Sequence, residues 1–534
     1  MLFNSYIFIF VFIPIVLLGV VITSKLTQKK FVIAWLIFSS LFFYGWWNPI
    51  YIFLLVFSIL INYSIGQILS NYKKRLFLIL GISFNVLLLG YFKYANFFVD
   101  NINFIFGEDL FIERIILPLA ISFFTFQQII YLIDSFKGET KSYKLLNYFL
   151  FVTFFPQLIA GPIVNHKDVM PQISNKKFGK LNYYNLVVGS TIFFVGLFKK
   201  VVIADSLALY ATPIFDASEI GIQITFLESW VGALAYTFQL YFDFSGYSDM
   251  ALGLARLFGI TLPINFYSPF KSTNIADFWR RWHITLSNFI KNYLFYPLAI
   301  VLTRYAIINK YKRFMTFIVT VVFPMAFAWG LAGLWHGAAW KFVIFGLMHG
   351  AYLTTYQLWT DIRTSIGLST VKFSLIRNSL SRVVTFMSVL ISFVIFRADS
   401  IESAISMYKS MFGFRGFSLP MALKPLFDRV GELPEILGVN FQGAFYNGLL
   451  SSNPLNAVLI IFLAFLLALF TPNVAQWLRS EKPALGLEGF ANDKGNSNTF
   501  SWKMNSFFLV ITALIAVISI MFLQKESEFL YFQF

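Results

Sequence analysis

Two of the four histidines in this 534-residue sequence stand inside one hydrophobic run. Residues 329–350 read WGLAGLWHGAAWKFVIFGLMHG, which surrounds His336 and His349 with glycine, alanine and large apolar side chains. A neutral imidazole carries one hydrogen-bond donor and one acceptor, and leaving either unpaired in a dry interior costs about 1–3 kcal/mol. Its pKa of about 6.5 in water also suits it to act as a general base. The run therefore predicts either buried polar contacts between helices or a catalytic base. The small residues beside His336 predict close helix packing or room for a substrate.

A second apolar stretch, residues 230–264, contains the charged side chains Asp243, Asp249 and Arg256. On insertion scales each charge costs about 2.5–3.5 kcal/mol at the centre of a bilayer, so pairing or a water-filled cavity is expected. Asp249 and Arg256 share a helix face two turns apart, too distant for direct contact without a third group. These residues form either a structural ion network or part of the reactive site, and Asp249 is a candidate substrate-binding residue.

Residues 274–283 read NIADFWRRWH and predict the start of a helix. Asn274 is a typical N-cap, and Asp277 stands at the third helical position, where a capping box places its acidic member. Residues 280–313 contain seven basic side chains and no acid, so this surface is expected to face the cytoplasm. Arg280 and Arg281 then either meet phosphates or anchor the helix at the membrane surface.

The composition is that of a membrane protein. It is 58% hydrophobic and only 12% charged, against roughly a quarter charged in soluble proteins. Apolar runs long enough to span a bilayer recur throughout and predict about eleven to fourteen transmembrane segments. The net charge is +16, and the basic residues fall in short loops between spans, as the positive-inside rule requires. This pattern favours a topological explanation of the charge over binding of nucleic acid or an acidic polymer. The absence of cysteine excludes disulfides, thiolate catalysis and thiolate metal sites.

Alternation of these segments gives an expected topology for a single domain, residues 1–534. The first apolar run lacks the features of a signal peptide and is expected to be a helix with its N-terminus outside. The turn at Trp46 and Trp47 is also expected outside. Residues 145–164, interrupted by Pro156 and Pro162, predict a re-entrant segment, which requires cover by protein or a water-filled cavity. The turn at His336 is expected toward the outer side, and the basic helix near His283 on the opposite side. Residues 412–454 are expected to form an extracytoplasmic loop region that docks a partner.

Several stretches together resemble the membrane-bound O-acyltransferases, in particular the branch that includes the alginate O-acetylation protein and the D-alanyl transfer protein of teichoic acids. The matching stretches occur in order along most of the chain and are residues 117–139 (LPLAISFFTFQQIIYLIDSFKGE), 155–163 (FPQLIAGPI), 196–205 (GLFKKVVIAD), 241–259 (YFDFSGYSDMALGLARLFG), 278–287 (FWRRWHITLS), 333–350 and 396–399 (FRAD). The resemblance implies an all-α polytopic membrane protein, a bundle of about 11–14 transmembrane segments with re-entrant helices and a central cavity or tunnel.

The resemblance also implies a chemistry and a set of residues. His336, in the Trp-His-Gly motif, corresponds to the catalytic histidine of the family, and His283 to a second motif histidine. Acyl transfer to a hydroxyl is implied, with acetyl-CoA as the expected donor in the cytoplasm and a sugar or a partner protein as the acceptor outside. The candidate substrate-binding residues are Trp335, Asp249, Arg280, Arg281 and His349. His166 receives no role and is expected in a loop.

Several expectations accompany this assignment. The four histidines lack the spacing of metal ligands on one helix, so no metal is expected. Expected partners are the lipid bilayer, a polysaccharide acceptor and an extracytoplasmic acetyltransferase-like protein, and the expected location is a bacterial cytoplasmic membrane. Two other classes of protein remain open, a transporter or flippase for lipid-linked saccharides and a noncatalytic scaffold of an export complex. Neither explains the two histidine motifs.

Overall fold

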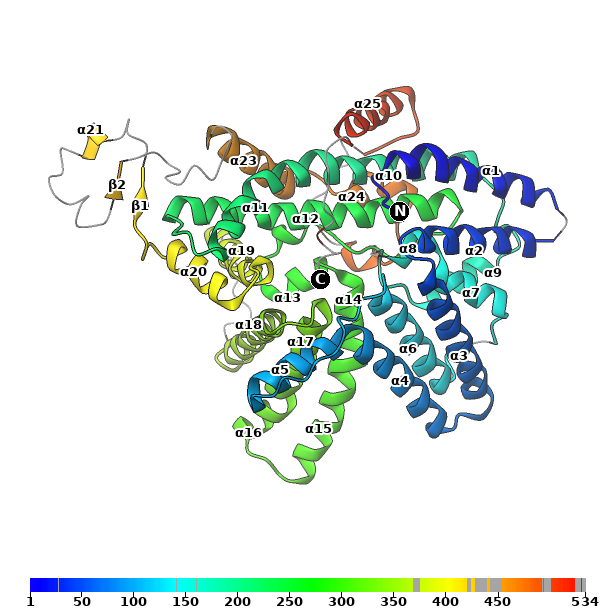
Figure 1. Ribbon diagram of the computed structural model, residues 1–534, viewed down its shortest axis with the longest axis horizontal. Helices are drawn as coiled ribbons and strands as arrows, with labels where there is room; N and C mark the ends of the chain where they lie inside the picture. Colours follow the sequence, from blue (N-terminus) through cyan, green and yellow to red (C-terminus); the bar gives the residue numbers. More distant parts are fainter. Residues whose placement is uncertain are drawn as a thin grey trace.

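The structure is a computed structural model that describes residues 1–367 except 27, 141 and 160, then 375–419, 424–427, 439–441, 454–491, 493, 501–523 and 530. These residues are almost entirely helical, and the one sheet among them is a two-residue parallel pairing of β1 with β2. Most of the predicted partner-docking region, 412–454, lies outside the described residues. The all-α prediction is confirmed (Figure 1).

The elements of the first half of the chain are helices joined by short loops. The elements are η1 (Phe8–Phe12), α1 (Ile13–Ser24), α2 (Lys30–Gly45), α3 (Ile50–Tyr72), α4 (Arg75–Leu89), η2 (Gly90–Tyr94), α5 (Ala95–Phe106), α6 (Ile121–Lys137), α7 (Leu145–Thr153), α8 (Phe155–Leu158), α9 (His166–Ser174), α10 (Tyr183–Phe198), η3 (Lys199–Ala204), α11 (Asp205–Glu219) and α12 (Phe226–Leu257). Three π-helical turns adjoin α-helices without a break: η1 leads into α1, η2 joins α4 to α5, and η3 joins α10 to α11.

The second half has shorter helices near the centre and long ones at the periphery. Its elements are η4 (Pro269–Lys271), α13 (Ile275–Arg281), α14 (Ile284–Phe289), η5 (Ile290–Phe295), α15 (Tyr296–Ile308), α16 (Arg313–Phe317), η6 (Ile318–Val322), α17 (Phe323–His336), α18 (Trp340–Ser365), α19 (Leu375–Arg397), α20 (Ile401–Met411), β1 (Phe417–Ser418), α21 (Lys424–Phe427), β2 (Val439–Asn440), α23 (Pro454–Phe470), α24 (Val474–Trp477), η10 (Arg479–Glu481), η11 (Glu488–Phe490) and α25 (Ser506–Phe522).

Among the described residues, five helices are long and apolar enough to cross a membrane. They are Ile50–Tyr72, Arg75–Phe106, Tyr183–Glu219, Arg313–His336 and Ile376–Arg397. Shorter apolar helices are Phe8–Ser24, Lys30–Gly45, Leu455–Phe470 and Ser506–Phe522. Large apolar side chains such as Phe53 (77% exposed) and Leu87 (71% exposed) cover the outer faces, which suits contact with lipid rather than water. The chain is a multi-pass membrane protein, as predicted, and the count of eleven to fourteen spans stays a prediction.

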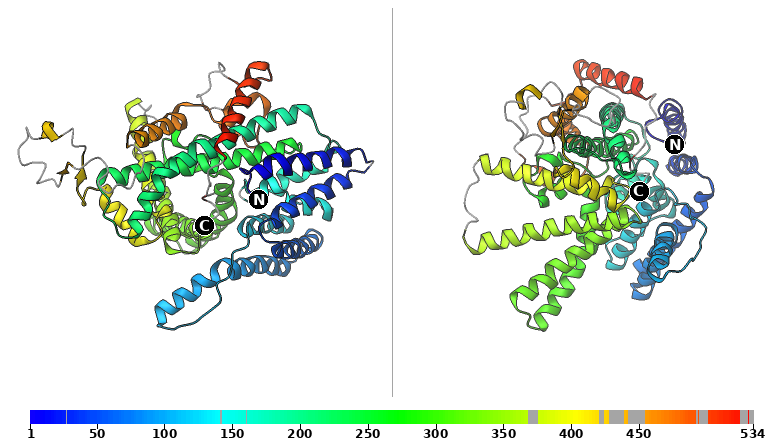
Figure 2. Two further views of the ribbon diagram at one scale, coloured as in Figure 1. Left: turned by 45° about the horizontal axis from the view of Figure 1, so that its top comes forward. Right: turned by 60° about the vertical axis from the view of Figure 1, so that its left-hand side comes forward.

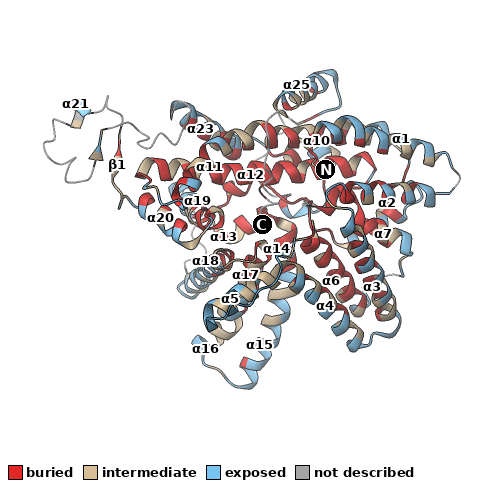
Figure 3. Ribbon diagram, viewed as in Figure 1, coloured by how far each residue is buried: buried red, intermediate tan, exposed pale blue. Residues whose placement is uncertain are grey.

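The 32-residue helix α12 is the buried axis of the fold (Figure 3). It begins with a capping box between Thr225 and Glu228, which satisfies two backbone donors that the helix would otherwise leave unpaired. It packs against α10, α11, α19, α20 and α23, and α10 and α11 run beside it in Figure 1. Nearly all of its residues are buried, as expected for a helix surrounded by others.

Glycines bring α10 and α12 into backbone contact at two places. A Cβ atom added at Gly253 would lie 2.5 Å from the carbonyl oxygen of Gly189, and one at Gly196 would lie 2.5 Å from that of Gly246. Each pair is reciprocal, because a Cβ at Gly189 or Gly246 would meet the partner's oxygen at 2.7 Å. Association of helices in lipid depends on such close packing, since there is no hydrophobic driving force between them.

The predicted re-entrant segment is a pair of short buried helices. The nine-residue α7 is about 14 Å long at 1.5 Å per residue, and the chain breaks at Phe154 before the four-residue α8. Neither helix is long enough to cross a membrane, and protein covers the break, since Phe154 and Phe155 are fully buried. Irregular backbone at membrane depth requires this cover.

The N-terminal helices and helices α15 to α19 lie on opposite sides of the molecule (Figure 2, right). The short helices α13 and α14 occupy the centre between them (Figure 1). α17 packs along α18 and ends with His336 in this central region.

Candidate active site

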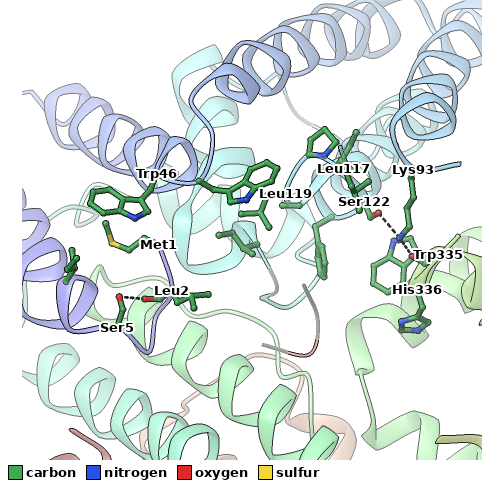
Figure 4. A pocket seen from close by; sticks show the side chains of 17 residues that line it. Met1, Leu2, Ser5, Trp46, Lys93, Leu117, Leu119, Ser122, Trp335 and His336 are labelled. Carbon is green, nitrogen blue, oxygen red and sulfur yellow. Dashed lines mark hydrogen bonds between the residues drawn. The ribbon is translucent and has the colours of Figure 1, made fainter. Parts of the chain in front are cut away.

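His336 stands at the wall of a cavity, at the point where α17 ends. The following residue, Gly337, is extended (φ −168°), so the chain leaves the helix directly after the imidazole. The cavity has a volume of about 660 Å³ and is lined by Trp335 and His336, by the N-terminal residues, by Trp46 and Trp47, and by residues 117–123 (Figure 4). The Trp-His-Gly turn is therefore open to a space large enough for a small substrate group.

Glycines near His336 serve close packing of α17 on α18. A Cβ at Gly333 would lie 2.0 Å from the carbonyl oxygen of Phe342, and one at Gly346 would lie 2.1 Å from that of Trp329. A Cβ at Gly337 would meet the ring of Phe342 at 2.1 Å. The small residues beside His336 predicted either close helix packing or room for a substrate, and the glycines at these positions allow close packing.

Two side chains of the Arg75–Phe106 helix hold the end of α17. Lys93 Nζ donates to the carbonyl oxygen of Trp335, and the hydroxyl of Tyr94 donates to that of Leu334 over 3.0 Å. The last carbonyls of a helix have no partner within the helix, so these two donors satisfy groups that would otherwise be unpaired. Sequence reasoning missed Lys93, although a lone lysine inside an apolar span is itself a signal of function.

Trp335 lies at the centre of the site. Its ring stacks on Phe126 at 5.5 Å between centroids and meets Phe123 edge-on at 5.5 Å. His336 lies 4.9 Å from the same indole and His283 lies 6.1 Å from it. Both imidazoles therefore lie beside one indole, and Lys93 contacts the backbone of the same tryptophan, so the three groups belong to one site.

His283 has a left-handed backbone conformation and lies beside Trp335. Its φ of 42° separates α13 from α14, so the two do not form one continuous helix. The expectation that the segment near His283 lies on the side opposite His336 is wrong for the histidine itself, because both imidazoles lie beside the Trp335 ring. A topology predicted by alternating successive spans across the membrane does not account for a left-handed conformation at a residue other than glycine.

Asn265 fixes the ring orientation of His283. Its Oδ1 accepts from His283 Nδ1 (3.1 Å), from the hydroxyl of Thr285 (3.0 Å) and from the backbone N–H of Thr285 (3.3 Å). Three converging donors identify this atom as the amide oxygen, so Nδ1 of His283 carries the proton and Nε2 is the acceptor nitrogen. Thr285 in turn accepts from the N–H of Ile163, which ties the predicted re-entrant segment to the site.

His349 is fully buried and both of its ring nitrogens have partners. Trp279 donates its indole N–H to Nδ1 over 3.1 Å, and Nε2 contacts the hydroxyl of Ser392 at 2.9 Å. That hydroxyl already donates to the carbonyl of Val389, so Nε2 is the protonated nitrogen. Among the residues that line the cavity, His349 is absent. This placement favours a role in joining three helices over the predicted contact with a substrate.

Asp249 and Asp243, on successive turns of α12, are paired with consecutive lysines of η3. Lys199 Nζ lies 2.5 Å from Asp249, and Lys200 Nζ lies 2.5 Å from Asp243 and 2.9 Å from Asp205. The pairing predicted for charges in this stretch is present, and its geometry favours the structural ion network over a substrate contact. Arg256 is not part of these pairs, since it donates to Thr261.

Arg280 and Arg281 are held by acids. The N-cap at Asn274 forms as predicted, accepting from the N–H of Asp277 over 2.8 Å. Asp277 pairs with Arg280 (2.7 Å) and with Arg281 (3.0 Å), and Asp493 lies 2.7 Å from Arg281. The negative charges of two carboxylates thus neutralise the positive charges of the two arginines. This pairing favours a role of the arginines in holding the chain around residue 493 over the predicted binding of phosphates.

His166 is not a loop residue as expected. It begins α9, is fully buried, and contacts Tyr143 through Nδ1 (3.0 Å) and Asp134 through Nε2 (3.2 Å). Tyr293 and Lys167 also contact Asp134, so the imidazole is part of a hydrogen-bonded network apart from the cavity.

Comparison with known proteins identifies the family of this chain. Residues 119–396 match the family described as MBOAT, membrane-bound O-acyltransferase family, a range that contains His283, His336 and His349. The chain is 40% identical to a peptidoglycan O-acetyltransferase of Helicobacter pylori over 91% of this chain and 93% of that protein. It is 38% identical to the probable alginate O-acetylase AlgI of Pseudomonas aeruginosa, over 78% and 76% of the two chains. It is 30% identical to a teichoic acid D-alanyltransferase of Streptococcus thermophilus, over 52% of this chain and 68% of that protein. With a histidine at the wall of a central cavity in a polytopic helical protein, this chain belongs to the membrane-bound O-acyltransferase family and is an acyltransferase enzyme.

Proposed function

We propose that this enzyme transfers an acetyl group from acetyl-CoA in the cytoplasm to a hydroxyl group outside the membrane, with His336 as the general base. The observation that carries the proposal is the position of His336 on the wall of the 660 Å³ cavity, beside Trp335. The walls include Trp46 and Trp47, whose turn is expected on the outer side, so an acceptor arriving from outside reaches the imidazole.

A base is what this reaction requires. A hydroxyl group is a weak nucleophile, and removal of its proton as the new bond forms contributes roughly 10² to 10⁴-fold to the rate. The hydroxyl oxygen attacks the thioester carbonyl, the C–S bond breaks, and the proton taken by His336 passes to the sulfur as the free thiol leaves. Atoms and charge balance without a metal or redox partner.

His283 and Trp335 complete the proposed site. Because Asn265 fixes Nδ1 of His283 as the protonated nitrogen, Nε2 is the nitrogen that we assign to accepting a proton during the transfer. Trp335 lies next to both imidazoles, so its indole shapes the space in which the acyl group is transferred. His336 and His283 are therefore the proposed catalytic pair.

The proposed acceptor is a polysaccharide of the bacterial cell envelope, reached directly or through an extracytoplasmic partner protein, and the proposed location is the cytoplasmic membrane. Peptidoglycan is the first acceptor to examine, because the H. pylori peptidoglycan O-acetyltransferase aligns with nearly the whole chain. Alginate-like polymers come second, since the AlgI proteins are less similar in sequence, at 38% identity for that of Pseudomonas aeruginosa and 34% for that of Pseudomonas putida, which aligns over the whole chain.

Mass spectrometry of envelope glycans tests the proposal. Cells that carry the wild-type chain should have ester-linked acetyl groups on a surface glycan, and cells that carry His336→Ala should lack them at equal membrane levels of the protein. Equal acetylation in both strains would refute the proposed function, and the identity of the acetylated glycan names the acceptor.

A further inference from the structure

Lys93 is a cation in the wall of the reaction cavity that the proposed mechanism has not yet used. It belongs to the π-helical turn η2, and its Nζ reaches the carbonyl oxygen of Trp335 and, at 3.5 Å, the hydroxyl of Ser122 (Figure 4). Because Trp335 directly precedes His336, the ammonium lies one peptide unit from the catalytic base. π-Helical turns occur often at functional sites, where they redirect a side chain.

Lys93 differs from Lys199 and Lys200 in having no acidic partner. Lys199 and Lys200 contact Asp249 and Asp243 at 2.5 Å. Among the described residues, no carboxylate lies within ion-pair distance of Lys93, and none lines the cavity that it shares with His336. An unpaired cation at membrane depth is costly, and such residues generally mark a functional site.

Lys93 also stands at the junction of two spaces. It lines the cavity of His336 and a second cavity of about 800 Å³, which includes Ala338, Asn96 and Asn103. The wall of this second cavity also includes the charged residues Asp100, Asp109 and Arg114.

We infer that Lys93 binds the carbonyl oxygen of the acyl group during transfer, as a catalytic residue that stabilises its developing negative charge. This inference rests on the proposed function. When the hydroxyl oxygen adds to the thioester carbonyl, the C=O electron pair moves onto the oxygen, and an N–H of Lys93 donates to that oxygen. The pair returns as the C–S bond breaks, so Lys93 neither gains nor loses a proton. The contact with Ser122 at 3.5 Å is at the limit of a hydrogen bond, so that N–H is easily redirected.

The competing explanation is that Lys93 only holds the end of α17. Tyr94 supplies a control, because this neutral neighbour makes the equivalent hydrogen bond to the preceding carbonyl, that of Leu334, over 3.0 Å. Holding the helix end therefore requires a donor but no positive charge. Stabilising an oxyanion gains from the charge as well as from the donor.

The test measures acetyl transfer from acetyl-CoA by full-length protein in membranes, as release of free CoA thiol with acceptor glycan present. Four variants are compared at equal amounts of folded protein: Lys93→Met, Lys93→Gln, Lys93→Arg and Tyr94→Phe. Loss of an oxyanion donor lowers kcat by about 10² to 10³-fold. We expect that loss in Lys93→Met, with the KM for acetyl-CoA changed less than about 3-fold, and a loss of at least about 30-fold in Lys93→Gln. Lys93→Arg should retain roughly a tenth of kcat or more, and Tyr94→Phe should stay within about 5-fold of wild type.

Several results would overturn the inference. Normal kcat in Lys93→Met or Lys93→Gln would exclude a role for the charge, and so would an equal loss in Tyr94→Phe. Should Lys93→Met not fold, Lys93→Gln decides, because it keeps a donor for the Trp335 carbonyl. His336→Ala in the same assay separates the two claims. If His336→Ala is inactive while Lys93→Gln is normal, only the assignment of Lys93 fails, whereas full activity of His336→Ala means that the proposed function fails.

Discussion

Trp279 donates its indole N–H to Nδ1 of His349 over 3.1 Å, deep between three helices. The two histidines of one sequence run therefore have different surroundings. His336 lines a cavity, whereas His349 has a partner on each nitrogen and is fully buried.

Replacing His349 should affect stability more than chemistry. In His349→Ala the indole N–H of Trp279 loses its acceptor, which costs about 1–3 kcal/mol, and the void adds to this loss. We expect a lower thermal unfolding temperature in detergent, with partial recovery in His349→Gln, whose amide offers both an acceptor and a donor. Acyl transfer per folded molecule should stay within about 5-fold of wild type. A His349→Gln protein of normal stability but without activity would instead support a contact with substrate.

Asp249 and Lys199 should behave as a structural ion pair. Removing one partner of a buried pair costs about 3–5 kcal/mol, because an unpaired charge remains. Asp249→Leu should therefore lower the yield of folded protein, and Lys199→Met combined with Asp249→Leu should restore most of it. Size-exclusion chromatography of the solubilised proteins measures the yield. If the double variant folds normally and is inactive, Asp249 acts on the substrate.

The contact between α10 and α12 should not tolerate a methyl group. In Gly253→Ala the new Cβ would lie 2.5 Å from the carbonyl oxygen of Gly189, so the helices must separate, at a cost of about 1–3 kcal/mol. Gly90→Ala is the matched control, since nothing lies within 4 Å of a Cβ at that helical position. Thermal unfolding of the two variants should differ clearly. Equal stability would mean that the two backbones are further apart than the structure has them.

Arg281 should hold the chain near residue 493 rather than bind the donor. Its guanidinium lies 2.7 Å from Asp493, and Arg280, which is 47% exposed, lies 4.0 Å from the same acid. We expect Arg281→Gln to increase protease cleavage around residues 479–503 and to leave the KM for acetyl-CoA within about 2-fold of wild type. Arg280→Gln should have a smaller effect on cleavage. A KM raised tenfold or more in Arg281→Gln, without added cleavage, would restore the phosphate-binding interpretation.

The sequence was sufficient to predict the helical membrane fold and to single out His336, which lines a cavity, because long apolar runs and a histidine within one are local signals. It also indicated that Asp243 and Asp249 need partners, since an isolated charge in lipid is costly. What the sequence did not reveal are relationships between distant segments. The pairing of Arg281 with Asp493 is of this kind, and so is the contact of Lys93 with Trp335.

The position of His283 was mispredicted for a conformational reason. Counting spans assumes that each segment continues in one direction, but a left-handed residue at His283 separates two short helices, α13 and α14. Asn265 then holds the imidazole there, from a part of the chain that precedes the basic helix. Neither feature has a distinctive sequence signal, because histidine and asparagine occur at such turns and also elsewhere.

The most direct test of the account is the rate of acetyl transfer by His336→Ala and His336→Gln in reconstituted proteoliposomes with radiolabelled acetyl-CoA and acceptor glycan. Loss of a general base predicts a decrease of roughly 10² to 10⁴-fold in single-turnover rate, with folding unchanged, because His336 faces the cavity. A rate within about 3-fold of wild type in either variant would contradict the claim that His336 is the base.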